Sequence, residues 1–271
     1  MKALIVGLAV VVAASPALAI KGLPYAREAV VHEGRWLVSG GISTGRLPDT
    51  EEAVDILMYG ARLGYGLTDG LELSGGLGML NLDLDFDVVG DDDPNAPEID
   101  VDPDFDNEPY FQIGVLYTLP LDLPFDIGLR GAVGYASLEE SNRDSDAIHT
   151  PAGPATVTME ADFEIDILSI NAGLLASKSF NPVLSLYGFC GVSYTRTSFD
   201  FTGRGSSDNP AVMAMIELQG DDRRSVSETE TTTDLAVAGG MIVNLGQRLS
   251  LYGEVAHIDE IWGSVGARLT F

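Results

Sequence analysis

The last eleven residues, 261–271, read IWGSVGARLTF, and apolar and polar side chains alternate along them. The odd positions carry the apolar or small residues Ile261, Val265, Ala267, Leu269 and Phe271, and the even positions include Ser264, Arg268 and Thr270. A period of two is that of a β-strand with one apolar and one polar face. Because the last residues of a soluble domain usually fray, this ending predicts a closing strand held in a sheet. It raises the question of which solvent the apolar face meets.

The first nineteen residues, MKALIVGLAVVVAASPALA, have the pattern of a secretory signal peptide. Lys2 supplies the charged start, residues 3–14 are an apolar stretch, and Ala17-Leu18-Ala19 is a small-x-small cleavage site. The alternative, an N-terminal membrane helix, fits less well, because this stretch is too short for a stable anchor. We therefore expect an exported chain that begins at Ile20.

Composition excludes several classes of protein. The formal charge of −26 leaves few bases for the phosphates of a nucleic acid, so no nucleic-acid partner is expected. Cys190 is the single cysteine, so no intrachain disulfide can form. After residue 19 no apolar run approaches the roughly 18 residues of a membrane-spanning helix. The remaining chain has a length that one β domain can reach.

Alternating stretches recur along the rest of the chain, and helical patterning is nearly absent among them. We expect ten strands, at 34–43, 54–67, 71–87, 109–119, 125–139, 161–178, 183–203, 229–245, 249–257 and 261–271. Eight strands are the alternative, if the weak first strand and the short ninth are miscounted.

The connections between these stretches alternate in length. Tight turns follow the second, fourth, sixth and eighth stretches, whereas long connections are expected at 44–53, 88–108, 140–160 and 204–228. One end of the molecule would therefore carry turns and the other would carry loops. Transmembrane β-barrels of bacterial outer membranes have this asymmetry and an even number of strands.

Alternation alone does not separate a membrane barrel from a soluble sandwich, but three further features favour the barrel. The polar faces are rich in glycine, which a crowded barrel interior can use. Several stretches exceed the five or six residues of a usual soluble strand and reach the about 9–11 that cross a bilayer. Aromatic residues cluster toward strand ends, as in interfacial girdles: Trp36, Tyr65, Tyr110, Phe111, Phe125, Tyr135, Trp262 and Phe271.

The ending at 261–271 resembles the closing strand of outer-membrane β-barrel proteins of Gram-negative bacteria, and the hairpin YGLTDGLEL at 65–73 resembles their periplasmic turns. The resemblance implies an all-β, antiparallel up-and-down barrel in the outer membrane, surrounded by lipid. It also implies that the terminal Phe271 helps the outer-membrane assembly machinery to recognise the chain. The expected division is a signal peptide at 1–19, an N-terminal periplasmic segment at 20–33 and the barrel at 34–271.

Charged residues in the strands are expected to face the lumen, because an Arg or Lys on the lipid face costs about 2–4 kcal/mol at the midplane. The strand phases assign three bases and six acids to this interior: Arg62, Glu72, Asp126, Arg130, Glu164, Asp166, Asp234, Glu254 and Arg268. Such a set could be a structural ion network or the lining of a cation-selective pore. The network is the favoured interpretation, because a barrel of about eight strands is filled by side chains.

The connection after the third stretch is strongly acidic, with nine acids and no base between Asp91 and Glu108. Within it Asp102, Asp104 and Asp106 have the spacing of the first ligands in a calcium-binding loop. The turn glycine and the final glutamate of that motif are missing. We therefore expect at most weak Ca²⁺ or Mg²⁺ binding there, no other cofactor, and a solvated, mutually repelling segment as the favoured alternative.

The sequence thus predicts a non-catalytic integral outer-membrane barrel with a structural or surface-interaction role and acidic extracellular loops. A narrow porin-like channel for small cations or solutes is the first alternative. The second is a hydrolase sited at the barrel rim, for which His257, near Asp259 and Glu260, would be the base. No phosphate-binding loop, Cys/His zinc set or nucleophile elbow is present.

Overall fold

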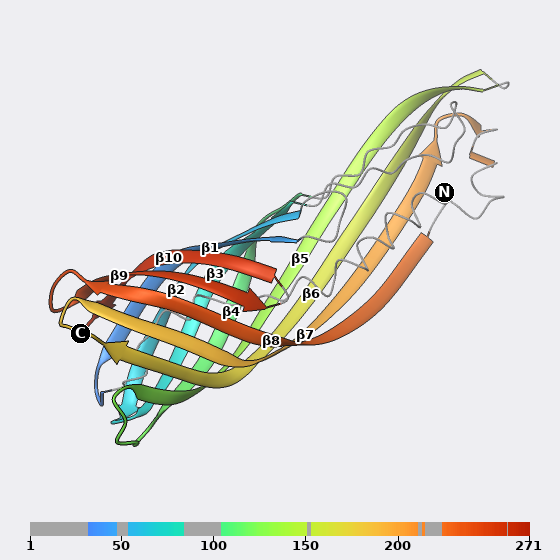
Figure 1. Cartoon of the computed structure of the whole chain (residues 1–271). Coiled ribbons are helices and arrows are strands. Elements are labelled where there is room, and N and C mark those ends of the chain that lie inside the picture. Colours follow the sequence, from blue (N-terminus) through green and yellow to red (C-terminus); the bar gives the residue numbers. More distant parts are fainter. Residues whose placement is uncertain are drawn as a thin grey trace.

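The computed structural model describes residues 32–47, 54–83, 104–150, 153–210, 213–214, 224–258 and 260–271. Ten strands form one closed antiparallel sheet in which each strand pairs with its sequence neighbours and the first pairs with the last (Figure 1). The strands are β1 Trp36–Leu47, β2 Val54–Thr68, β3 Leu71–Asp83, β4 Asp104–Leu119, β5 Asp126–Thr150, β6 Gly153–Ser179, β7 Leu184–Ser207, β8 Arg224–Asn244, β9 Leu249–Ile258 and β10 Glu260–Thr270. The predicted up-and-down barrel of ten strands is confirmed, and the alternative of eight is wrong.

The barrel closes between β1 and β10, in a register that runs from Leu37 opposite Thr270 to Gly45 opposite Trp262. The backbone N–H of Phe271 donates to the Trp36 carbonyl at 2.9 Å, and the Trp36 N–H donates to the Phe271 carbonyl at 3.2 Å. The end of the chain is therefore held in the sheet, as the alternation at 261–271 predicts.

The signal peptide and most of the N-terminal segment at 20–33 lie outside the described residues, so the division of the chain stays a prediction. In the part of the chain that the structure describes, no helix is long and apolar enough to span a membrane.

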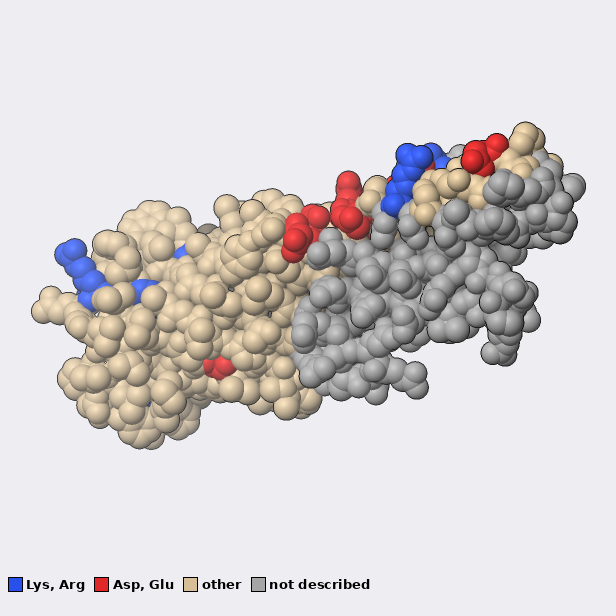
Figure 2. Space-filling model, turned by 90° about the horizontal axis from the view of Figure 1, so that it is seen from above, with Lys and Arg blue, Asp and Glu red and all other residues tan. Residues whose placement is uncertain are grey.

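The outer surface of the barrel carries a belt of exposed apolar side chains from all ten strands. Ile261 is the most exposed of them, at 72%. The apolar face predicted for the closing strand is confirmed on β10, and Cys190 lies exposed on this surface in phase with Leu186. In Figure 2 the barrel surface is a broad band nearly free of charged groups, which is the surface that a bilayer requires.

Four strands extend far beyond this belt. β5, β6, β7 and β8 have 25, 27, 24 and 21 residues, whereas β9 and β10 have 10 and 11, close to the length that crosses a bilayer. The difference of 16 residues between β6 and β10 corresponds to roughly 50 Å of strand at about 3.3 Å per residue. In Figure 1 the four strands leave the barrel together as a curved sheet, which we call the extension.

The extension corrects two predicted loops. Residues 140–150 and 153–160 are paired strands, with a continuous register from Asp126 opposite Ser177 to Thr150 opposite Gly153. The predicted connection at 204–228 likewise shortens to the residues between Ser207 and Arg224. The physical reason is cross-strand pairing: Ser141 Oγ donates to Asp162 at 2.8 Å, and the Ser198 and Thr229 hydroxyls lie 3.0 Å apart. Such polar ladders stabilise strands that have no strong hydrophobic alternation.

The interior of the barrel is filled by side chains and holds two apolar clusters. The larger comprises Ile56, Met58, Leu80, Leu82, Phe105, Tyr110, Ala136, Leu138, Ala161, Phe163, Ile165, Ile167, Phe199, Phe201 and Trp262. The expectation that Tyr110 and Trp262 belong to interfacial girdles is therefore wrong, because both are almost fully buried inside. Trp36, Phe111, Phe125, Tyr135 and Phe271 are exposed, as a girdle requires.

Glycine makes room for the large interior side chains. A methyl group on Gly45 would lie 2.6 Å from Cδ2 of Trp262, and one on Gly64 would lie 2.7 Å from a carboxylate oxygen of Glu72. A Cβ atom essentially never lies this close to a non-bonded atom. The glycines therefore allow the large side chains to approach the backbone closely. The glycine-rich polar faces seen in the sequence are thus explained by interior packing.

Candidate functional site

The barrel interior is layered along its axis. The larger apolar cluster lies toward the extension and includes residues from β2, β3, β4, β5, β6, β7 and β10, so it spans most of the barrel circumference. Its members are at most 8% exposed. Because interiors pack to near-crystalline density, this layer leaves no wide aqueous passage among the described residues.

A charged layer lies toward the end that carries the tight turns. Arg62, Glu72, Arg130, Glu254 and Arg268, from β2, β3, β5, β9 and β10, are all buried, as predicted. Nη2 of Arg62 lies 3.6 Å from the Glu72 carboxylate and donates to Ser74 Oγ at 2.9 Å. The hydroxyl of Tyr187 donates to Glu254 at 2.9 Å. The first two contacts join the neighbouring strands β2 and β3, and the third joins β7 to β9 inside the barrel.

The other four predicted lumen charges behave differently. Asp234 has the inward phase of β8, whereas Asp126 is exposed at the first residue of β5. The assignment of Glu164 and Asp166 to the lumen is wrong. Phe163, Ile165 and Ile167 occupy the inward positions of β6, so both acids point outward, and Asp166 accepts a hydrogen bond from the exposed Tyr135 at 2.6 Å. The error arose because β6 continues above the belt, where charge on the outer face costs nothing.

A polar stripe that the sequence analysis missed crosses three adjacent strands inside the barrel. It comprises Ser169 and Asn171 of β6, Ser193 and Thr195 of β7, and Thr232 and Asp234 of β8. The register places Ser193 between Asn171 and Asp234, and Thr195 between Ser169 and Thr232. Each of the six has a buried side-chain oxygen without a hydrogen-bond partner in the protein. Because buried polar groups are normally satisfied, six such oxygens side by side distinguish this stripe from the apolar clusters of the interior.

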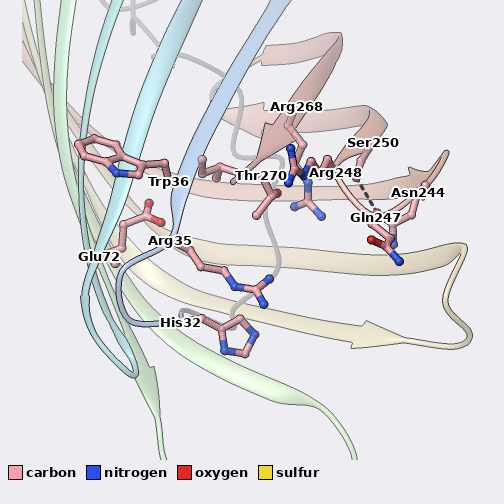
Figure 3. Close-up of a pocket in the computed structure, with 13 residues that line it drawn as sticks. His32, Arg35, Trp36, Glu72, Asn244, Gln247, Arg248, Ser250, Arg268 and Thr270 are labelled. Carbon is pink, nitrogen blue, oxygen red and sulfur yellow. Dashed lines mark hydrogen bonds between the residues drawn. The ribbon is translucent and has the colours of Figure 1, made fainter.

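A pocket of about 230 Å³ opens at the turn end of the barrel (Figure 3). Its lining residues are His32, Arg35, Trp36, Leu37, Gly66, Glu72, Asn244, Gly246, Gln247, Arg248, Ser250, Arg268 and Thr270. They come from the chain before and within β1, the β2–β3 hairpin, the β8–β9 turn and β10. Sequence reasoning found only Glu72 and Arg268 here. The sequence feature that could have indicated the other lining residues is a basic residue next to the start of each of two strands. Arg35 precedes β1, and Arg248 precedes β9.

The candidate metal ligands fall at the edge of the described chain. Asp102 lies outside the described residues, and β4 begins at Asp104, five residues before the predicted strand start. Asp106 is exposed and accepts a hydrogen bond from the Asn81 amide at 3.2 Å. Asn107, with a φ of 60°, lies at a shift in the β3–β4 register. Among the described residues no group of three metal-binding side chains is present, and the cation site stays a prediction.

The outer rim above the belt holds an acidic group at the start of β4. Burial, and then the negative charge of Glu139, raise the pKa of the Glu108 carboxyl above its ordinary value. The hydrolase candidate His257 is exposed on the outer face of β9, in phase with Val255. Its proposed partner Asp259 lies outside the described residues. The side chain of Glu260 is likewise outside the described part of the chain, so the hydrolase candidate stays a prediction.

No protein-family model and no curated protein matches this chain. Among solved structures it is similar to Ail, the attachment invasion locus protein of Yersinia pestis, with 14% identity over 88% of this chain and 99% of that one, and a TM-score of 0.34. The outer membrane protease OmpT from Escherichia coli is 9% identical over 93% and 99% of the two chains, with a TM-score of 0.38. The translocator domain of the autotransporter NalP from Neisseria meningitidis is 13% identical over 88% and 89%, with a TM-score of 0.49.

At these identities a likeness concerns the fold alone, and the geometry of the chain itself carries the assignment. The sheet is closed and antiparallel, its strand number is even, its exterior is an apolar belt, and tight turns gather at one end. The chain therefore has the fold of the bacterial outer-membrane β-barrel proteins.

Proposed function

We propose that this protein is a non-catalytic, integral outer-membrane barrel whose role is to hold the extension of β5–β8 on the outside of the cell for structural or surface contacts. The observation that carries the proposal is the combination of a side-chain-filled interior with strands about twice as long as a membrane crossing. A barrel that conducts solutes needs an open lumen, and no part of conduction needs roughly 50 Å of paired strand beyond the membrane.

The chemistry of the extension supports a contact surface. Its outward positions carry exposed acids from three of the four strands, namely Glu139, Glu160, Glu164 and Asp200. Hydrogen bonds between neighbouring strands hold the sheet in shape. Such a surface fits partners that carry positive charge or bound divalent cations.

Orientation can be tested with single cysteines in a Cys190→Ser background. Ser141 on the extension and Gln247 in the β8–β9 turn are both exposed and form a matched pair. A membrane-impermeant maleimide applied to intact cells should label Ser141→Cys at once and Gln247→Cys only after the outer membrane is permeabilised. Labelling of Gln247→Cys alone in intact cells would reverse the orientation and refute the proposal.

A narrow channel is the second candidate, because the polar stripe on β6–β8 supplies polar oxygens inside the barrel. Recordings of the purified protein in planar bilayers separate the two functions. The first proposal expects no discrete conductance steps. Small cation-selective steps that disappear in Asp234→Asn would establish the channel instead, since Asp234 is the one carboxylate in the stripe.

A further inference from the structure

We propose that the pocket at the turn end binds a small oxyanion, a phosphate or carboxylate group, and that Arg35 and Arg248 are its main ligands. This inference does not rest on the proposed function of the extension. It concerns the opposite end of the barrel, which faces the periplasm if the turns of this fold have their usual side.

The first argument is charge. The chain has 15 Lys and Arg residues against 41 Asp and Glu, yet three arginines and His32 line this one cavity. The only carboxylate in the lining is Glu72, whose side chain also lies 3.6 Å from Arg62 inside the lumen. The backbone N–H of Glu33 donates to the Asp69 carboxylate at 3.1 Å, and neither of these two acids lines the cavity. The lining is therefore positive in a strongly negative protein.

The second argument is preorganisation. The Arg35 carbonyl accepts from the Gly66 N–H at 3.0 Å, and the Arg248 carbonyl accepts from the Thr270 N–H at 2.9 Å. The backbone of each arginine is thus hydrogen-bonded to a neighbouring strand. Arg268 is only 7% exposed and forms the inner wall. In Figure 3 the side chains of Arg248 and Arg268 come from one side of the pocket and that of Arg35 comes from another.

The third argument is the kind of donor. Guanidinium groups present flat, paired N–H donors that match the oxygens of phosphate and carboxylate. Gln247 and Asn244 add amide groups to the lining. Ser250 donates to the Asn244 amide oxygen at 2.6 Å, and the Asn244 NH₂ donates to the Pro182 carbonyl at 3.1 Å, so one N–H of Asn244 remains as a donor. Among the described residues neither Arg35 nor Arg248 forms an ion pair. Arginines outnumber carboxylates three to one in the lining, and a bound anion would reduce the repulsion between them.

Size restricts the ligand. A volume of about 230 Å³ is below the roughly 300–1,000 Å³ of pockets for drug-sized molecules. A free phosphate, a small dicarboxylate or one headgroup of a lipid would fill it. Because the pocket faces the barrel axis and not the apolar belt, we favour the soluble source.

The test uses the full mature barrel in zwitterionic detergent, titrated with inorganic phosphate at constant ionic strength while calorimetry and Trp36 fluorescence are recorded. We expect saturable binding that weakens at least tenfold in Arg35→Gln/Arg248→Gln and is unchanged in the control Arg204→Gln, an exposed arginine at the far end of β7. Unheated gel migration checks that each variant is folded. Both arginines of the double variant are exposed, so their replacement should leave the barrel intact.

Two further arms distinguish the sources of the anion. Succinate tests a carboxylate, and reconstitution into phosphatidylglycerol instead of phosphatidylcholine tests a lipid headgroup. Loss of phosphate binding only in phosphatidylglycerol would mean that the headgroup occupies the site, which supports the oxyanion pocket and names the lipid as its source. Absence of saturable binding of phosphate and of succinate in detergent and in phosphatidylcholine, or an equal loss in Arg204→Gln, would overturn the proposal.

Discussion

Trp262 and Gly45 face each other across the seam where the barrel closes, and replacing them separately and together tests how the interior is packed. Trp262 is 1% exposed in the larger apolar cluster, directly opposite Gly45 in the β1–β10 register. Truncation of a buried aromatic residue typically costs about 3–5 kcal/mol of unfolding free energy. Trp262→Ala should fall in that range.

Gly45→Ala should be destabilising for the opposite reason. The added methyl group would lie 2.6 Å from Cδ2 and 2.7 Å from Cε3 of the Trp262 ring. The backbone of Trp262 is paired on both sides, to β1 and to β9, so the ring has little freedom to retreat. Overpacking of this kind costs about 1–3 kcal/mol.

The double variant tests whether the destabilisation by Gly45→Ala and the destabilisation by Trp262→Ala arise from the same volume in the interior. Once Trp262 is an alanine, the new methyl group enters the vacated volume, so the double variant should cost about as much as Trp262→Ala alone. This corresponds to a coupling energy of about 1–3 kcal/mol, within the range for residues in contact. Unfolding in urea should be followed by circular dichroism of barrel reconstituted in lipid, because the variants without Trp262 keep Trp36 alone and their fluorescence is not comparable with that of the parent.

Gly253 provides the control, because a methyl group there would have no heavy atom within 4 Å. Gly253→Ala combined with Trp262→Ala should give additive costs to within about 0.5 kcal/mol. Additive costs for Gly45 and Trp262, or a neutral Gly45→Ala, would show that the ring does not cover Gly45 and would refute the packing argument.

Three other predictions concern the ends and the outer rim of the molecule. Phe271→Asp should lower the amount of barrel in the outer membrane of cells more than it lowers stability in detergent, as compared by membrane fractionation and urea unfolding, because the exposed side chain contributes only one lipid-facing residue; normal membrane levels would contradict this. The segment at 91–108 should resist limited proteolysis better in millimolar Ca²⁺ than in chelator or in NaCl of equal ionic strength, and equal cleavage in Ca²⁺ and NaCl would dismiss a metal site at Asp102, Asp104 and Asp106. Burial, and then the charge of Glu139, raise the pKa of Glu108 above its ordinary value, so the folded barrel holds this proton more tightly than the unfolded chain. Stability is therefore gained as the pH falls and lost as it rises through the raised pKa. Thermal midpoints at pH 7 and pH 4.5 should therefore differ less in Glu108→Gln than in the parent, and identical differences would place Glu108 in an unperturbed environment.

The alternation of apolar and polar side chains predicts much of this fold, and it is visible in the sequence alone. The ten-strand count and the lipid-facing residues of β10 were predicted correctly, and the charged residues Arg62, Glu72, Arg130, Glu254 and Arg268 of the expected lumen set are buried. These predictions succeed because a strand inside a bilayer has only two environments, lipid and lumen, and the energetic difference between them fixes the phase.

Outside the bilayer that constraint disappears, and there the sequence analysis failed. Both faces of the extension can carry polar groups, so residues 140–150, 153–160 and 204–207 had the composition of loops although they pair as strands. Glu164 and Asp166 were placed in the lumen by a rule that applies only within the membrane. A weak signal was present, since Ala155, Val157, Ala161 and Phe163 keep the inward phase of β6.

The sequence by itself therefore determined the class of fold, the closing strand and the lipid-facing surface, because each depends on the local period of two. Only the tertiary structure decided that Tyr110 and Trp262 fill the lumen, that six unpartnered oxygens align across β6, β7 and β8, and that Arg35, Arg248 and Arg268 converge on one pocket. Strand register and barrel closure set these relations, and they join residues more than two hundred positions apart, as Gly45 and Trp262 are. Alternation indicates which face of the sheet a residue occupies, whereas the register of the closed sheet determines which residue it contacts there.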